Sequence, residues 1–577
     1  MGPNDSVLHP ALRSILFGIE LFISVTIGIT IVFPVLFVVL SINEFLRLLI
    51  RIGLWLFYGD YYELCTEPIS SNYAVLPKED NCRTILYASE VEGPLDIQEI
   101  RQHYQKHVVG NKIFRNLKYI WENKWLFMCL KKCENFDISN HVRIYPGSED
   151  RVITEKELLQ EVLPELRLDM PGQDKPQWEE VIIQKYKPVS GDVKAMRILR
   201  MHHSYMDGTS TLLHFVANTW SGEPETFPYV INPCKPLKIS NAFMFIYKLT
   251  CVALFPLFLI KRLAQPPIFK TSRFSADTSR GKALFSWTKP MPINEFRHIK
   301  DKSGVSMSGV LAAVLAGAMR NFELKYPAEN KKFSTERHPF WIVAGIFPFP
   351  SDRLCNDHVV IETYLDTSDI SGCERLSEMN DELSRMSKNP AVTINFWFAS
   401  LMGRGPSIIV NLLVSWIQCS TVLSNVPLCT RRIKFGGKEC YGLNGWVPLM
   451  AKAGLCITTV RYGEHMRYCL QAHPSVVTEE QLAYLVNQIE DQVDELGLEV
   501  STLQRKISTD ITLFECEKKG GDSGVEDDFR NEDEFNKLNN NNDSNGKVTI
   551  SNKYSLLFKL KDSIEQIRDG IKKIKEE

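Results

Sequence analysis

One short segment of the chain, HHSYMDG at residues 202–208, combines residue types that could do chemistry together. Residues 194–201 before it are aliphatic enough for a strand, and residues 209–220 after it carry apolar side chains at helical spacing. Neighbouring residues of a strand point to opposite faces, so only one of His202 and His203 can face a given cleft. A histidine with its usual pKa of about 6.5 suits general-base removal of a hydroxyl proton near neutral pH.

Asp207 and Gly208 complete this segment. The carboxylate of Asp207 lies four residues beyond His203 and can brace the loop without touching a substrate. Gly208 allows the backbone to turn tightly. A base that deprotonates an acceptor alcohol directly needs no activated Ser or Cys nucleophile. A histidine pair by itself is usually structural, but the full pattern HHxxxDG at a strand-to-helix junction is more specific.

HHxxxDG resembles the signature of the coenzyme-A-dependent acyltransferase superfamily. Within that superfamily, roughly residues 136–496 are most similar to the wax ester synthase/diacylglycerol acyltransferase family. The supporting segments are FDISNHV at 136–142, KPQWE at 175–179, SNVP at 424–427, GLCIT at 454–458 and RYG at 461–463. Each segment is short, and their order along the chain carries the resemblance.

The resemblance implies an α+β fold of two chloramphenicol-acetyltransferase-like lobes with a tunnel between them, preceded by an N-terminal membrane helix. It makes His203 the general base, His202 a supporting neighbour and Asp207 a structural brace. Acyl-CoA would enter from one side as co-substrate, the acceptor alcohol would enter from the other, and no permanently bound cofactor or metal is expected. The oxyanion formed on the thioester needs hydrogen-bond donors. Ser424 or Asn425 could supply one, although Asn425 could equally brace a loop.

Two departures from the family pattern concern polar residues. The family's Asn-Asp pair is replaced by Ser308 and Gly309 at the start of a helix expected over residues 309–322. The family's Pro-x-Ser-x-Arg segment appears as residues 349–353, in which Arg353 could pair with Asp207 across the lobes or lie on the surface.

Residues 1–60 are expected to attach the chain to a membrane. Residues 15–40 contain one acidic residue, Glu20, and are long enough to cross a hydrocarbon layer of about 30 Å. Residues 45–58 favour an interfacial helix in which Arg47 and Arg51 reach the lipid headgroups.

The rest of the chain divides into four parts. Residues 61–240 form the lobe with HHxxxDG, and residues 270–500 form the second lobe. Residues 241–269 are a hydrophobic crossover whose apolar run, 243–260, is either a membrane contact or a core helix. Residues 501–577 are a polar disordered tail with a terminal amphipathic helix.

Composition excludes several functions. The chain has 577 residues, a net charge of -2 and 44% hydrophobic residues, so it gives no support for a nucleic-acid binder or a polytopic transporter. Its 14 cysteines show no zinc spacing and no disulfide framework, which favours reduced thiols and a catalytic unit facing the cytosol.

These observations predict a membrane-anchored O-acyltransferase located at the endoplasmic reticulum. It would move a long-chain acyl group from acyl-CoA to a fatty alcohol or to diacylglycerol, and its oligomeric state is left open. The alternatives are a different alcohol acceptor, a condensation-type domain, or a non-catalytic lipid-binding membrane protein on an acyltransferase fold.

Overall fold

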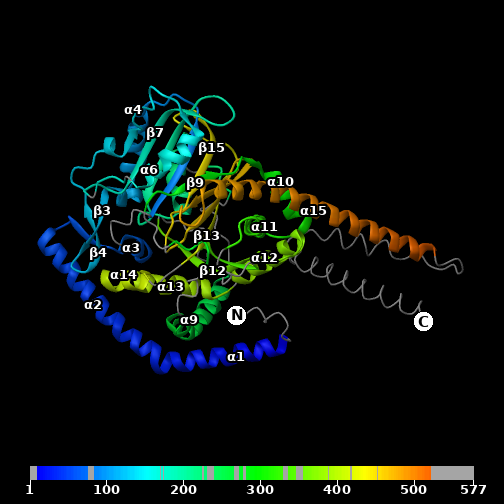
Figure 1. Ribbon diagram of the computed structural model, residues 1–577. Helices are drawn as coiled ribbons and strands as arrows, with labels where there is room; N and C mark the ends of the chain where they lie inside the picture. The colour runs from blue at the N-terminus through cyan, green and yellow to red at the C-terminus, as the bar shows by residue number, and fades with distance from the viewer. Residues whose placement is uncertain are drawn as a thin grey trace.

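The computed structural model describes residues 10–75, 83–168, 170–172, 174–223, 226–230, 240–264, 272–276, 281–328, 336–345, 355–387, 389–415, 419–450 and 452–520 (Figure 1). These residues contain two seven-stranded sheets, a three-stranded sheet and the helices that cover them. The two-lobed α+β architecture expected from the sequence is confirmed.

The first sheet comes mainly from the N-terminal half of the chain. Its strands, in spatial order, are β14 (Lys434–Phe435), β15 (Lys438–Trp446), β2 (Thr84–Val91), β8 (Lys194–His202), β7 (Trp178–Lys187) and β5 (Val142–Ile144), with β6 (Ile153–Thr154) beside β7. Strand β8 lies between β2 and β7 and is antiparallel to both. All eight residues of β2 are buried, so the centre of this sheet is covered on both faces.

Short helical elements surround this sheet. They are α4 (Ile97–Tyr104), η3 (Gln105–Val109), η4 (Lys112–Lys118), η5 (Ile138–Asn140), α5 (Glu155–Glu157), η6 (Leu158–Val162), α6 (Leu163–Leu168), α7 (Gly208–Ser210), η7 (Thr211–Val216) and α8 (Ala217–Thr219). The three-stranded sheet lies at the base of this lobe and has the order β1 (Tyr62–Leu64), β4 (Phe127–Lys132), β3 (Tyr119–Lys124). Helix α3 (Pro68–Ala74) follows β1 and runs toward the junction of the lobes.

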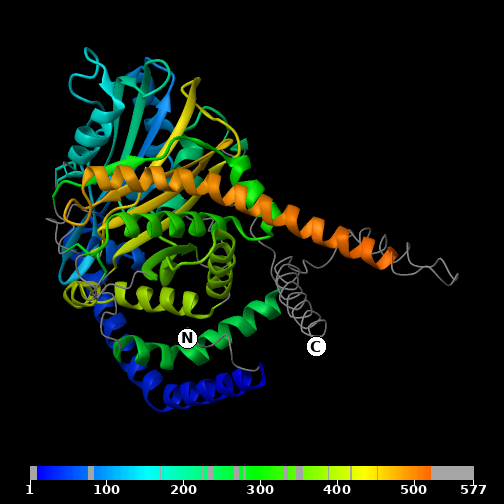
Figure 2. The same cartoon turned by 45° about the vertical axis from the view of Figure 1, so that its right-hand side comes forward.

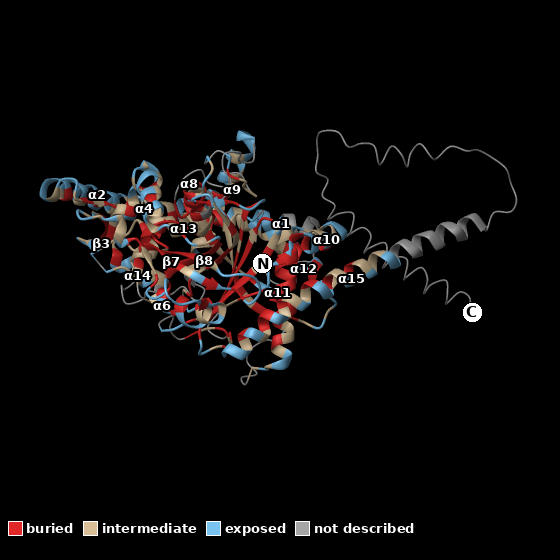
Figure 3. Cartoon of the chain, turned by 90° about the horizontal axis from the view of Figure 1, so that it is seen from above, coloured by how far each residue is buried: buried red, intermediate tan, exposed pale blue. Residues whose placement is uncertain are grey.

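The second sheet comes from the C-terminal half. Its order is β10 (Met291–Pro292), β17 (His465–Ala472), β16 (Leu455–Tyr462), β13 (Thr421–Cys429), β11 (Arg337–Gly345) and β12 (His358–Asp366), with β9 (Leu284–Trp287) against β17. Four helices pack together beside it: α10 (Ile293–Ser303), α11 (Met307–Lys325), α12 (Gly372–Ser387) and α15 (Glu479–Gly520). The helix predicted over 309–322 is therefore confirmed as the buried part of α11, drawn red in Figure 3.

One pair of strands crosses between the lobes. Strands β14 and β15 belong to the C-terminal half in sequence, but β15 pairs antiparallel with β2 in the first sheet. The predicted second lobe, 270–500, is therefore wrong for residues 434–446. Hydrogen bonding along β2 and apolar packing decide this placement, and Trp446 joins the first core with 1% of its surface exposed.

Three apolar helical segments lie along one side of the molecule (Figures 1 and 2). α1 (Pro10–Ile27), the π-helical turn η1 (Gly28–Val32) and α2 (Phe33–Tyr58) follow one another without a break, and α9 (Asn241–Ala264) packs on α1 and η1. Among the described residues, Ile15–Tyr58 and Asn241–Arg262 are long and apolar enough to cross a membrane. Residues 15–40 and 45–58, predicted as a span and a separate interfacial helix, thus form one helical segment.

Helices α1 and α9 run antiparallel and meet where α9 is interrupted by Pro256. Proline lacks an N–H and disturbs the helical hydrogen bonds of its own turn. The hydroxyl of Ser24 satisfies two of the affected groups, because it donates to the carbonyl oxygen of Ala253 at 2.6 Å and accepts from the N–H of Leu257 at 3.2 Å. Six large apolar side chains of α9 are exposed and only Cys251, Phe255 and Pro256 of residues 243–260 are buried, so this run is not a core helix.

Charged side chains in these helices have specific partners. Lys261 Nζ of α9 lies 3.1 Å from Glu20 Oε1 of α1. Arg47 is buried and donates to the carbonyl oxygen of Cys65 at 2.8 Å, so its predicted position at the lipid headgroups is wrong. It fixes α2 to the body of the protein, whereas Arg51 is exposed.

Two further helices lie between α9 and the sheets. They are α13 (Ala391–Gly403) and α14 (Ser407–Ser415). Helix α13 packs against α9 on one side and against α3 and β12 on the other.

The C-terminal helix is longer than the sequence analysis predicted. Thr478 caps α15 by accepting the N–H of Gln481 at 3.2 Å, as its sequence indicated. The helix then continues to Gly520, past the predicted start of the tail at residue 501. Residues 501–519 contain no Gly or Pro, so nothing in their sequence ends the helix earlier. Residues 521–577, including the predicted terminal helix, lie outside the described residues.

Candidate active site

The HHxxxDG segment lies at the end of a central strand, as the sequence predicted. Strand β8 ends at His202, and α7 begins at Gly208. Asp207 is the N-cap of α7, because its Oδ1 accepts the N–H of Ser210 at 2.6 Å. The intervening loop runs to the junction with the second lobe, where it meets residues 355–358.

His203 is buried and is held by Asn356 from the second lobe. The Nδ1 atom of His203 lies 3.0 Å from Asn356 Oδ1. The amide of Asn356 can face only this way, because its Nδ2 donates to the carbonyl oxygen of His203 at 2.9 Å and to Ser70 Oγ at 2.9 Å. An amide oxygen accepts hydrogen bonds, so Nδ1 of His203 carries the proton. The lone pair is thereby on Nε2, the atom that can act as a base.

The pKa of His203 supports the neutral form. Burial lowers this pKa, and repulsion from His358 lowers it further, while the carboxylate of Asp207 acts in the opposite direction. A lowered pKa leaves the imidazole unprotonated near neutral pH, which is the state a general base requires.

The rings of Tyr73 and His358 complete the surroundings of His203. The ring of Tyr73, from α3, stacks on the His203 ring with centroids 4.0 Å apart and planes 9° apart. The Tyr73 hydroxyl lies 2.8 Å from His358 Nε2. Tyr73 therefore fixes the His203 ring from one face and links it to His358, the first residue of β12.

Asp207 braces the junction of the lobes. Its Oδ2 accepts the backbone N–H of Asp357 at 3.0 Å and lies 3.3 Å from Nδ1 of His358. Burial acts to raise the pKa of Asp207, but hydrogen bonding and attraction from His358 outweigh it, so the pKa is lowered. The described hydrogen bonds of the carboxylate go to His358 and to backbone N–H groups and not to His203, in agreement with a bracing position.

His202 and Gly208 have different surroundings. His202 Nδ1 accepts the N–H of Ser204 at 3.3 Å and lies 2.8 Å from the Ser204 hydroxyl. Burial lowers the pKa of His202 to about 3, with repulsion from Arg83 adding to it. Gly208 is packed so closely that a Cβ there would lie 2.9 Å from the Tyr87 hydroxyl, which explains why glycine follows the aspartate.

Three predicted site residues are not joined to this cluster by any contact among the described residues. Ser424 and Asn425 lie on β13 of the second sheet, where Thr459 Oγ1 donates to Asn425 Oδ1 at 3.0 Å. Their role toward an oxyanion stays a prediction. Arg353 lies outside the described residues, and the described side-chain partner of Asp207 is His358.

The unusual start of α11 has a structural explanation. Ser306 caps the helix by accepting the N–H of Gly309 at 3.1 Å, and Asn380 accepts the N–H of Ser306 at 2.9 Å. A Cβ at position 309 would lie 3.0 Å from Asn380 Cβ, so a larger residue would push α12 away. Helix packing thus accounts for glycine where the family has a polar residue.

The FDISNHV and KPQWE segments meet behind the loop. His141 Nδ1 donates to the carbonyl oxygen of Trp178 at 2.7 Å, and its ring stacks between Phe136 and Trp178 with centroid distances of 4.8 and 4.7 Å. Both segments therefore support the strand that ends in His202.

Sequence reasoning missed Asn356, His358, Tyr73 and Ser70 as neighbours of the candidate base. A signal existed for the first two, because polar residues 356–358 directly precede the β-branched run of β12. Tyr73 and Ser70 lie in a short helix with no local sequence signal. Among the described residues, no group of three or more His, Cys, Asp or Glu side chains could hold a metal ion.

Comparisons with known proteins agree with this fold. Residues 358–497 match the family model of the WS/DGAT C-terminal domain, whereas no curated protein sequence matches significantly. The structure of wax ester synthase/diacylglycerol acyltransferase from Marinobacter aquaeolei VT8 is 17% identical, with a TM-score of 0.51 over 75% of this chain and 98% of that one. The starter condensation domain of rhizomide synthetase RzmA is 13% identical, with a TM-score of 0.50 over 76% of this chain and 94% of that one.

The two-lobed fold with HHxxxDG at its junction defines an acyltransferase-type protein. The match of residues 358–497 to the C-terminal domain of the wax ester synthase/diacylglycerol acyltransferase family agrees with the resemblance drawn from the sequence, and the solved structure from Marinobacter aquaeolei VT8 shares the fold.

Proposed function

We propose that this protein is an O-acyltransferase that moves a long-chain acyl group from acyl-CoA to a lipid alcohol, with His203 as general base. The observation that carries the proposal is the hydrogen bond from His203 Nδ1 to Asn356 Oδ1, which leaves Nε2 as the basic atom. Catalytic histidines are commonly held in one tautomer by the partner of the other ring nitrogen.

The reaction needs one proton acceptor and no covalent intermediate on the protein. Nε2 of His203 takes the hydroxyl proton while the alcohol oxygen bonds to the thioester carbonyl carbon. The tetrahedral oxyanion then collapses, the carbon–sulfur bond breaks, and the proton on His203 passes to the departing thiolate of coenzyme A. Ser424 and Asn425 remain the candidates for oxyanion donors.

The acceptor is proposed to be a fatty alcohol or diacylglycerol. Both present a hydroxyl group on a hydrocarbon tail, and pockets lined by methylene groups separate such molecules only modestly. A non-catalytic lipid-binding protein is the alternative. The replacement of the family's Asn-Asp pair by Ser308 and Gly309 favoured this alternative. The packing of Gly309 against Asn380 gives the replacement a structural reason instead.

We expect esters to form when membranes containing the protein receive labelled acyl-CoA and either hexadecanol or diacylglycerol. The host should lack its own neutral-lipid acyltransferases, and membranes without the protein serve as the control. Chromatography of the labelled lipids measures the product. If neither alcohol, nor any other, is esterified while lipid binding persists, the non-catalytic alternative is correct.

We further propose that the protein is attached to a bilayer by α1, α2 and α9 lying along it, with the catalytic body on the cytosolic side at the endoplasmic reticulum. Residues before and after α9, such as Val230 and Phe274, belong to the same body. If α9 crossed once, the seven residues 265–271 would have to return across about 30 Å of hydrocarbon, but at about 3.5 Å per residue they reach only about 25 Å when fully extended. Irregular backbone does not occur exposed to lipid.

The antiparallel packing of α1 on α9 extends this argument to the N-terminal helix. The Glu20–Lys261 ion pair and the Ser24 hydrogen bonds hold α1 alongside α9. We therefore propose that residues 15–40, expected from the sequence to span the membrane, lie in its plane. Described cysteines such as Cys133 and Cys373 are thiols, which agrees with a reducing compartment.

Protease protection tests this placement. In sealed microsomes, an N-terminal and a C-terminal epitope tag should both be digested from the cytosolic side, because an in-plane helix leaves both ends of the chain on one side. Detergent-opened microsomes provide the control for intrinsic digestion. An N-terminal tag that is protected until detergent is added would show that the helix crosses.

A further inference from the structure

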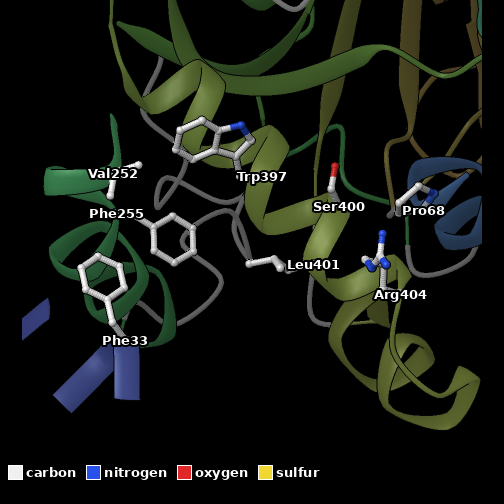
Figure 4. Close-up of a pocket in the computed structure, with 8 residues that line it drawn as sticks. All are labelled: Phe33, Pro68, Val252, Phe255, Trp397, Ser400, Leu401 and Arg404. Carbon is white, nitrogen blue, oxygen red and sulfur yellow. The ribbon is translucent and has the colours of Figure 1, made fainter. Parts of the chain in front are cut away.

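An apolar pocket opens between the candidate membrane helices and the catalytic body. It has a volume of about 370 Å³, in the usual range for small-molecule sites. Its lining is Phe33 of α2, Val252 and Phe255 of α9, Trp397, Ser400 and Leu401 of α13, with Pro68 and Arg404 at one end (Figure 4). The lining is almost entirely apolar, so the pocket suits hydrocarbon and not coenzyme A.

One wall of the pocket belongs to the segments that we place in the bilayer. Phe33 begins α2, and Val252 and Phe255 lie one turn apart on α9. Val252 is 44% exposed, whereas Phe255 is buried against α13. A hydrocarbon chain can therefore pass from the lipid side into the pocket without contacting water.

The opposite end of the pocket leads toward the candidate base. Pro68 is the first residue of α3, and the same helix carries Ser70, which hydrogen-bonds to Asn356, and Tyr73, which stacks on His203. Helix α13 is fixed to α3 by the hydrogen bond from Asn72 Nδ2 to the carbonyl oxygen of Ala399 at 2.8 Å. One short helix thus separates the pocket from the His203 cluster.

An ion pair between Arg404 and Glu44 marks the polar end of the pocket. Arg404 Nε lies 2.9 Å from Glu44 Oε1 of α2, and both side chains are partly exposed. The carbonyl oxygen of Arg404 also accepts hydrogen bonds from Asn43 and Arg47, so the end of α13 is tied to α2. An apolar pocket with one charged end fits an amphiphilic alcohol. Its hydrocarbon tail would lie against the apolar lining, and its hydroxyl group would point toward the charged end.

We propose that this pocket is the route by which the hydrocarbon tail of the acceptor alcohol passes from the bilayer toward His203. The inference rests on the proposed acyltransferase function and adds to it the source of the acceptor: a membrane-dissolved lipid alcohol, taken up between α9 and α13. A short, water-soluble alcohol can reach the base without this route.

Leu401→Trp tests the route by filling the pocket. In phosphatidylcholine vesicles, the ratio of kcat/KM for hexadecanol to that for hexanol is expected to fall by about tenfold or more. Val252→Trp, from the other wall and already partly exposed, should have the same effect if Leu401→Trp does not fold. Ile408→Trp is the matched control, because Ile408 lies on α14, is 70% exposed and is outside the pocket. A ratio that stays at the wild-type value in both pocket variants overturns the proposal.

Photolabelling gives a reading that does not depend on turnover. Hexadecanol carrying a diazirine in its chain, dissolved in the same vesicles, should label peptides of α9 and α13 in the wild-type protein and in Ile408→Trp, and less in Leu401→Trp. Equal labelling of all three proteins would contradict the proposal that the pocket holds the hydrocarbon tail of the alcohol. If the wild-type protein esterifies neither of these alcohols nor diacylglycerol, the proposed function has failed, and the labelling still decides whether the pocket holds a lipid tail.

Discussion

Replacement of His203 by alanine is expected to lower kcat for ester formation by about 10²–10⁴-fold, the usual contribution of a general base. Alanine removes Nε2, and among the described residues of the cluster no other group with a free basic nitrogen contacts the same loop: His202 accepts from Ser204, and His358 is engaged by Tyr73 and Asp207. The initial rate with labelled acyl-CoA and hexadecanol or diacylglycerol measures the effect.

His202→Ala is the matched control for this substitution. It removes the adjacent histidine, which is half-buried, but leaves the hydrogen bond between His203 and Asn356 in place. Its effect on kcat should stay below about tenfold, because no step of the proposed proton transfer uses it. Thermal unfolding of both variants separates loss of the base from loss of the fold. A His203→Ala protein that folds and loses less than about tenfold activity would exclude His203 as the base.

Asn356→Ala is expected to reduce kcat by about 10²-fold with little change in the KM for acyl-CoA. The substitution removes the acceptor for His203 Nδ1, so the ring can rotate and the proton can move to Nε2. Small displacements of a catalytic group have effects of about this size. Steady-state rates at saturating acyl-CoA measure the loss. Ser70→Ala is the control, since it removes one hydrogen bond of Asn356 and leaves the contact with His203.

Asn356→Asp distinguishes positioning of His203 from simple structural support. A carboxylate still accepts the Nδ1 proton, so more activity should be retained than with alanine. Its negative charge favours the imidazolium, which raises the pKa of His203. In the wild-type protein the pKa of His203 is lowered, so the imidazole stays neutral even when the pH falls below 6.5, roughly the usual pKa of histidine. The acid limb of kcat/KM should therefore move to higher pH in Asn356→Asp. An unchanged pH profile with activity as low as in the alanine variant would leave Asn356 a structural role only.

Local sequence predicted the elements whose patterns are strong. The strand before His202, the helix after Gly208, the buried part of α11 and the Thr478 cap all follow from periodicity or capping residues within a few positions. Boundaries were predicted less well. Nothing in residues 434–446 indicates that β15 joins the first sheet, because strand pairing depends on a partner more than 300 residues away in the chain.

The membrane-facing helices show the same limit. Hydropathy predicted that residues 15–40 and 243–260 are helical and apolar, but it could not tell a crossing helix from one lying along the surface. The contacts of Glu20 and Ser24 with α9 favour a helix lying along the surface. So does the fact that the residues before and after α9 belong to one body. Arg47 was misjudged because its partners, Cys65 and Arg404, are backbone carbonyl groups distant in sequence.

The sequence by itself indicated the chemistry that this protein can offer: a histidine pair at the end of a strand, followed by an aspartate and a glycine at the start of the next helix. Only the tertiary structure decided which ring nitrogen is free. That choice depends on Asn356, Ser70 and Tyr73, which the folding of two lobes brings to His203 from distant parts of the chain. Residue type sets the reactivity of a side chain, but its tautomer and pKa are set by neighbours that only the fold assembles.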